Sequence, residues 1–284
     1  MKLGIFAKTF NRPTLEETLD AIAGHGLRQV QFNLVCAGLP TLPERIEAGL
    51  CARIRSAFQS RHLTMAAVSG TFNLIDPDPS KRQAGLDRLR VLIEAAPDLE
   101  TNLITLCTGT RDPQNMWAAH PENCSEGAWS DLLHSIETAL GVAEARHVTL
   151  GIEPELANVV SSAAKARRLL DNFGSPYLKI VMDPANLFPA GQISRMQEII
   201  GEAFELLGKD IRVAHAKDLS ADGRAGQEAA GTGLLDYDYY IGQLSHYRYE
   251  GPLILHSLAE SQVNRSLQFL KERMAQRHAQ VTAP

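Results

Sequence analysis

The sequence predicts an α/β protein folded as one (β/α)8 TIM barrel, and three observations support this fold class. Eight short apolar runs of strand length recur along the 284 residues. Segments in which apolar residues have helical spacing lie between these runs. Acidic residues or histidines follow several of the runs, where strands of such a barrel carry catalytic groups. This architecture takes about 250 residues, so we expect residues 1–284 to form a single domain.

The eight expected strands are mostly rich in leucine or in β-branched residues, which favour buried strands. They are Leu3–Phe6, Gln29–Phe32, Thr64–Val68, Leu103–Cys107, Val148–Ile152, Leu178–Met182, Ile211–Ala214 and Pro252–Leu255.

Four of the intervening segments have clear helical signals. Thr14–Gly26 opens on a threonine followed three residues later by Glu17, a pattern typical of a capping box, and it ends in two glycines. Ser125–Ala145 also opens on a candidate capping residue and carries an apolar stripe. The remaining two are Ser161–Gly174 and Ser266–Arg277.

An open doubly wound sheet is the competing fold, but it normally carries a G-x-G-x-x-G phosphate turn, which this sequence lacks. Two expected loops, Arg111–Asn123 and Leu219–Gly233, are longer than the usual connection in a compact domain. Loops of this length are often functional.

The composition and charge of the chain argue against some classes of function. The net charge is −5 and the pI is about 6.0, whereas nucleic-acid binding requires a basic face. No run approaches 18 apolar residues, so we expect no membrane span, and the first apolar run is too short for a signal peptide. The four cysteines form no C-x-x-C pair, which indicates free thiols in the cytoplasm.

Four consecutive strands lead to metal-type residues, namely Glu153, Asp183, His215 and His256, each about one βα unit after the last. Because strands that follow one another in sequence are neighbours in a barrel, these side chains should converge at its mouth. Two imidazoles and two carboxylates suit a divalent transition metal better than Mg²⁺ or Ca²⁺. We therefore expect one divalent metal ion, with manganese first and zinc, cobalt or iron as alternatives.

Each of these residues alone has a structural alternative. A carboxylate after a strand can cap the next helix, and His256, which follows "PLIL", can be a core histidine hydrogen-bonded to its neighbours. The joint pattern over four strands favours the metal site.

These residues also carry a family resemblance. "GIEPE", "VMDPANLF", "VAHAKD" and "GTGLLDYDYYIGQL" resemble segments of the sugar phosphate isomerase/epimerase group, the xylose isomerase-like barrels. The resemblance implies that Glu153, Asp183 and His215 are metal ligands. The fourth ligand of that group is usually a glutamate, where this chain has His256. In its ketose epimerases, this glutamate and the one after the fifth strand act as paired acid/base catalysts, and only Glu153 is retained here.

The same group contains endonucleases that use three zinc ions. Their additional histidines would follow the third and fourth strands, where this chain has Ser69 and Thr108. Together with the acidic pI, this argues against DNA repair and a nucleic-acid partner.

A metal ion that polarises a carbonyl group needs a base to remove the neighbouring proton. Glu153 is the first candidate. Glu155, two residues later, is the second, and a salt bridge or capping role is its alternative. Lys217 is the third, because residues i and i+2 of an extended chain point the same way, as His215 and Lys217 would. Its alternative is an ion pair with Glu153 or Asp183.

Polar side chains near the strand ends are candidates for substrate binding. Arg111 either holds an anionic group or pairs with Asp112 or Glu122. The full set is Ser69, Asn73, Thr108, Arg111 and Asn186.

The sequence thus predicts a metal-dependent isomerase or epimerase of a small sugar, keto-sugar or polyol, acting by proton transfer alpha to a carbonyl. A lyase that dehydrates a keto-polyol at the same site is one alternative, and a sugar-binding barrel without activity is another. We expect a small carbohydrate as partner, with a homodimer as one option.

Overall fold

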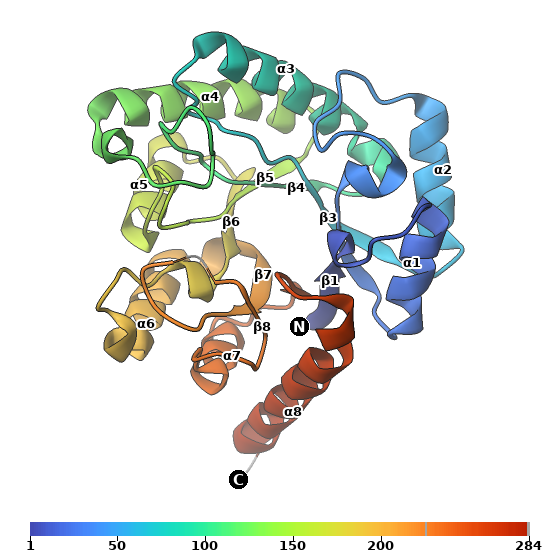
Figure 1. Ribbon diagram of the computed structural model, residues 1–284, viewed down its shortest axis with the longest axis vertical. Helices are drawn as coiled ribbons and strands as arrows, with labels where there is room; N and C mark the ends of the chain where they lie inside the picture. The colour runs from blue at the N-terminus through green and yellow to red at the C-terminus, as the bar shows by residue number, and fades with distance from the viewer. Residues whose placement is uncertain (225, 283–284) are drawn as a thin grey trace.

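The computed structural model describes residues 1–224 and 226–282, and its centre is the predicted barrel (Figure 1). Within these residues, eight parallel strands close in chain order, and the last pairs with the first. They are β1 (Lys2–Phe6), β2 (Gln29–Phe32), β3 (Thr64–Ser69), β4 (Leu103–Leu106), β5 (Thr149–Ile152), β6 (Leu178–Met182), β7 (Ile211–Asp218) and β9 (Pro252–Leu255).

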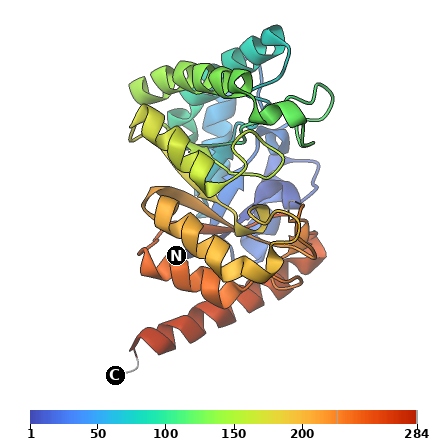
Figure 2. The same cartoon turned by 90° about the vertical axis from the view of Figure 1, so that its left-hand side faces the viewer.

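Helices surround the strands, and the side view shows them flanking the barrel (Figures 1 and 2). They are α1 (Leu15–Gly24), α2 (Ala48–Gln59), α3 (Pro79–Ala95), α4 (Glu126–Ala145), α5 (Ala163–Phe173), α6 (Met196–Leu207), α7 (Tyr237–His246) and α8 (Val263–Thr282). The predicted (β/α)8 fold is therefore confirmed.

Local signals set several helix starts. The Thr14 hydroxyl accepts a hydrogen bond from the Glu17 amide, and the Ser125 hydroxyl accepts one from the Ala128 amide, as capping residues do. The α5 cap is Ser162, one residue inside the expected segment. The α8 helix begins at Val263, three residues before the predicted start.

Strand β7 differs most from the prediction, which ended it at Ala214. It continues to Asp218 because Lys217 and Asp218 pair with β8 (Glu228–Ala229), a short antiparallel strand from the following loop. His215 and Lys217 therefore lie inside a strand, on a backbone held by sheet hydrogen bonds.

The barrel interior contains a small apolar cluster directly below the mouth. It consists of Ala67, Leu103, Val181, Val213 and Ile254, with Phe6 packed against it. Each of the five precedes a polar residue near the mouth by two positions, for example Val213 before His215. Because alternate residues of a strand share a face, the same strands carry an apolar layer and, above it, a polar layer.

The other core lies between the strands and the helices and contains large buried side chains such as Phe188, Phe204 and Tyr240. The four cysteines are free thiols. In the part of the chain that the structure describes, no helix has both the length and the apolar character needed to cross a membrane.

Candidate active site

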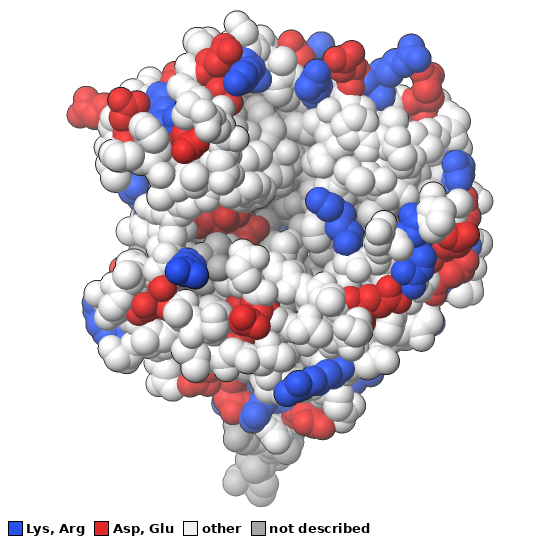
Figure 3. Space-filling view, viewed as in Figure 1, with Lys and Arg blue, Asp and Glu red and all other residues white. Residues whose placement is uncertain are grey.

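The carboxyl ends of the strands open into a cavity of about 1160 Å³. Figure 3 shows it as a hollow with acidic atoms in its depth and basic atoms at its rim. The wall from β1 to β4 carries Lys8 and otherwise mainly neutral polar groups, namely Gln31, Asn33, Thr41, Ser69, Thr71 and Thr105. The opposite wall carries ionisable groups, namely Glu153, Glu155, Lys217, Arg224 and His256.

Both long loops predicted from the sequence contribute to this cavity. Met116 and Trp117 come from the loop between β4 and α4, and Trp117 is half exposed. Arg224 and Gln227 come from the loop Leu219–Gly233, in which residue 225 lies outside the described part of the chain.

Three of the predicted metal-type residues meet at the cavity floor. The Nδ1 atom of His215 lies 3.3 Å from Oδ2 of Asp183 and 3.5 Å from Oε1 of Glu153. One ligand atom from each residue falls within a group whose members are all within 4.8 Å of one another. Asp183 and His215 are almost completely buried.

Hydrogen bonds orient the two carboxylates. Asp183 follows β6 and accepts a hydrogen bond through Oδ1 from the amide of Ala185, which leaves Oδ2 toward His215. The side-chain amide of Asn186 donates to Oε1 of Glu153 at 2.7 Å. Asn186 thus supports the cluster.

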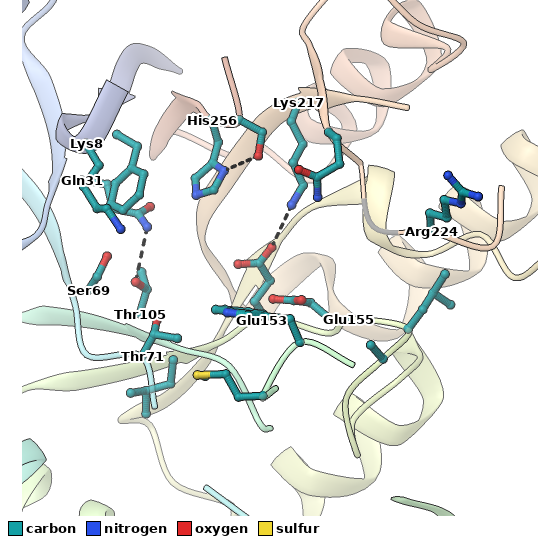
Figure 4. Close-up of a pocket in the computed structure, with 18 of the residues that line it drawn as sticks. Lys8, Gln31, Ser69, Thr71, Thr105, Glu153, Glu155, Lys217, Arg224 and His256 are labelled. Carbon is teal, nitrogen blue, oxygen red and sulfur yellow. Dashed lines mark hydrogen bonds and ion pairs between the residues drawn. The ribbon is translucent and has the colours of Figure 1, made fainter. Parts of the chain in front are cut away.

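Lys217 completes the charge balance of the cluster, and Figure 4 shows its contact with Glu153. Its Nζ atom lies 3.0 Å from Oδ2 of Asp183 and 3.7 Å from Oε1 of Glu153. This is the ion pair that one of its two sequence interpretations expected, and a catalytic role stays a prediction.

The pKa values of these groups follow from their mutual contacts. Burial alone would lower the pKa of His215, but Glu153 and Asp183 outweigh burial and raise it to about 9. Burial alone would raise the pKa of both carboxyl groups, but the cations His215 and Lys217 outweigh it and lower both.

Glu155 lies beside Glu153 in the cavity wall (Figure 4) and is 8% exposed. Its backbone amide donates to the carbonyl of Val160, but its carboxyl group has no hydrogen bond or salt bridge within the described structure. Burial, with the nearby charge of Glu153, raises the pKa of Glu155 to about 8. Within the described residues, the Glu155 carboxyl group therefore has neither the salt bridge nor the capping contact that its alternative interpretation required.

His256 lies next to the three-residue group and is not a member of it. Its ring is stacked between Phe6, at a centroid distance of 4.9 Å, and His215, at 4.8 Å. Burial and the nearby cations His215 and Lys217 keep its pKa well below the usual range, so the ring is neutral. Its Nδ1 atom lies 3.0 Å from the Ser257 hydroxyl. A ligand role for His256 stays a prediction.

The proposed substrate-binding residues fall into two groups. Ser69 lines the cavity, and Asn186 contacts Glu153 as described above. The others, Asn73, Thr108 and Arg111, lie outside the set of cavity-lining residues.

Those three side chains instead form hydrogen bonds or ion pairs that stabilise loops. The amide of Asn73 donates to the carbonyl of Thr110, and the hydroxyl of Thr108 accepts from the amide of Val160. Arg111 forms a 2.6 Å ion pair with Asp131, so its expected pairing with Asp112 or Glu122 was wrong. Asp131 lies on α4, and only tertiary packing brings it to this loop.

Sequence reasoning missed Gln31 and Thr105, which both reach the cavity from inside strands (Figure 4). A signal was present, because each is a polar residue between two apolar neighbours of its strand, in "QVQF" and "LITL". The Nε2 atom of His215 lies 2.9 Å from Oε1 of Gln31.

The cluster fits a divalent transition metal ion. Metal bonds to carboxylate oxygen and imidazole nitrogen are about 2.0–2.2 Å long, so one ion can bridge ligand atoms up to about 4.4 Å apart. The two distances from His215 to the carboxylates lie within this span. In addition, Oδ1 of Asn186 is buried without a hydrogen-bond partner beside Glu153, so an unused oxygen acceptor lies at the same place.

Comparisons with known proteins agree with this architecture. A model of the family described as "Xylose isomerase-like TIM barrel" matches residues 19–273. No curated protein matches the chain.

Solved structures with the same fold are numerous, and three illustrate them. A D-tagatose 3-epimerase-like protein has a TM-score of 0.80 at 15% identity, covering 99% of this chain and 100% of that one. An L-ribulose 3-epimerase has a TM-score of 0.78 at 16% identity, covering 100% and 98%. The 3-keto-D-glucoside 4-epimerase from E. coli has a TM-score of 0.71 at 17% identity, covering 96% and 99%.

Proposed function

The chain belongs to the xylose isomerase-like TIM barrel family, and from this premise we propose that it is a divalent-metal-dependent isomerase or epimerase of a small sugar, keto-sugar or polyol. The observation that carries the proposal is the group of Glu153, Asp183 and His215 at the floor of an open cavity. The names of the three similar structures, all sugar epimerases or epimerase-like, point to the same substrate class.

Glu153, Asp183 and His215 would hold the ion, with His256 as the proposed fourth ligand. When bound, a divalent ion polarises a carbonyl group and stabilises the negative charge that develops on its oxygen. Manganese is the first candidate, and zinc, cobalt and iron are the alternatives.

We assign the proton transfer at the carbon next to the carbonyl to Glu155. A general base needs a free proton-accepting atom within reach of the substrate. The Glu155 carboxyl faces the cavity without a hydrogen-bond partner in the described structure, whereas Glu153 is engaged by Asn186, His215 and Lys217. Lys217 holds the two buried carboxylates in place and is the candidate proton donor.

The neutral polar groups on the β1 to β4 side of the cavity suit a polyhydroxylated substrate. Hydroxyl and amide side chains can both donate and accept hydrogen bonds, so they match sugar hydroxyl groups without requiring charge. The groups of this kind are Gln31, Asn33, Thr41, Ser69, Thr71 and Thr105.

A dehydrating lyase is the second candidate. One observation favours it, namely that His256, and not a glutamate, follows β9, so the opposite carboxylate base of the ketose epimerases is lacking. Elimination needs one base and an acid for the departing hydroxyl group. A barrel that binds sugar without turnover is the third candidate.

One experiment separates these three candidates. The protein is loaded with manganese and incubated in D₂O with a panel of ketoses and keto-sugars. The manganese is then removed from the sample before NMR. Deuterium incorporation without loss of water indicates an isomerase or epimerase, and loss of water indicates a lyase. No change in any sugar that binds indicates a binding protein. Glu155→Gln should abolish turnover and retain metal binding, and unchanged rates would remove Glu155 from the mechanism.

A further inference from the structure

A hydrogen bond connects Gln31 on β2 with His215 on β7 at the floor of the cavity. Gln31 is 3% exposed, and its Oε1 atom lies 2.9 Å from Nε2 of His215. The opposite nitrogen of the ring, Nδ1, faces Asp183 and Glu153. The imidazole is therefore held at one edge by a neutral amide and at the other by the two carboxylates.

The Gln31 amide also contacts a third residue. Its Nε2 atom donates to the hydroxyl of Thr105 on β4 at 3.4 Å (Figure 4). The amide nitrogen is thus directed to Thr105 and the amide oxygen to His215. Since a carbonyl oxygen only accepts hydrogen bonds, Nε2 of His215 must carry the hydrogen.

We propose that Gln31, whose amide oxygen faces His215, is a positioning residue that keeps a hydrogen on Nε2 of His215 and so presents Nδ1 as the metal-binding nitrogen. This inference rests on the metal site of the proposed function. Neutral imidazole has one N–H and one free lone pair, so a fixed Nε2–H leaves the lone pair on Nδ1, next to the two carboxylates. Rotation of the amide by 180° would favour the opposite tautomer, with no lone pair directed at the carboxylates.

Substitutions at Gln31 separate this role from simple packing. Gln31→Leu fills similar space but removes the acceptor, so metal affinity should fall about 10-fold or more, as for the loss of partners of metal-bound histidines. Gln31→Glu keeps an acceptor oxygen at the same place and should retain affinity within about 3-fold of the parent or exceed it. Gln227→Leu is the matched control, since Gln227 lines the same cavity and has no hydrogen bond to His215.

The test uses the full chain labelled with ¹⁵N-histidine and titrated with ¹¹³Cd²⁺ alone, without sugar. We expect ¹¹³Cd coupling to Nδ1 of His215 and a retained proton on Nε2, with the His215 signals assigned by their loss in His215→Asn. Affinities for the parent and the variants come from competition with a chelator, and circular dichroism confirms that each variant is folded.

Coupling to Nε2, or a folded Gln31→Leu protein that binds within 3-fold of the parent, would overturn the inference. A parent protein that binds no cadmium would overturn it together with the proposed metal site. Cadmium bound through Nδ1, lost in Gln31→Leu and retained in Gln31→Glu, supports the inference even if no sugar is turned over. If these binding results hold and no sugar is turned over, only the proposed catalytic function fails.

Discussion

Replacing Lys217 by methionine tests how the charges of the buried cluster balance one another. The ammonium lies 3.0 Å from Asp183 and 3.7 Å from Glu153. At an effective dielectric constant of about 20, its attraction to each carboxylate is about 5 kcal/mol. Much of this attraction offsets the cost of burying the ammonium group. Breaking a buried ion pair therefore costs about 3–5 kcal/mol net, and we expect this loss in the free energy of unfolding.

A bound metal ion should reduce that loss, because a dication between the same carboxylates replaces the missing positive charge. Lys217→Met should therefore bind manganese more tightly than the parent. Its stability deficit should shrink by about 1 kcal/mol or more at saturating manganese, since ligand that binds only the folded state stabilises it by mass action.

Urea unfolding, followed by circular dichroism with chelator and then with excess manganese, measures both quantities. Lys179→Met is the matched control, because Lys179 pairs with Asp210 at 2.6 Å and Arg167 remains as a second partner. Its smaller loss, about 1 kcal/mol, should not depend on metal. A Lys217→Met deficit below 1 kcal/mol in chelator, or one that manganese leaves unchanged, would refute the reasoning.

Three further predictions concern single residues. Glu153→Gln should abolish turnover while the fold remains intact, because the change removes a ligand charge and preserves shape; near-parental rates would exclude Glu153 from catalysis. His256→Ala should lower metal affinity about 10-fold, and His256→Glu should restore it with a preference for harder ions; chelator competition measures both, and unchanged affinity in His256→Ala would mean that His256 is no ligand. Asp210→Asn should destabilise the protein near neutral pH. Burial opposes ionisation of Asp210, but hydrogen bonds from Lys179 and Arg167 outweigh it and lower its pKa below 3.8. Its contribution is therefore present above about pH 4 and lost as pH falls through the lowered pKa, so parent and variant should converge in stability in acid; a difference that persists there would contradict this assignment.

The strands and their order could be predicted from sequence because buried parallel strands leave short apolar runs. The boundaries of β2, β6 and β9 were predicted without error. The meeting of Glu153, Asp183 and His215 followed from strand order alone, since neighbouring strands of a closed barrel bring their ends together.

Other features depend on contacts between distant segments, which local patterns do not encode. The extension of β7 arises from pairing with β8, and the partner of Arg111 is supplied by α4. The orientation of His256 is set by rings from two other strands, those of Phe6 and His215.

The two layers inside the barrel have a consequence for how the chain tolerates insertions and deletions. Val213 and His215 share the inward face of β7 because they are two residues apart, and Asp183, directly after β6, has the same spacing from Val181. Insertion of one residue before Val213 would turn both side chains of β7 to the outer face, exchanging them for their neighbours. A length change in such a strand therefore removes a piece of the interior packing and a candidate metal ligand in one step. A length change in a loop, by contrast, leaves the alternation of side chains within each strand unchanged.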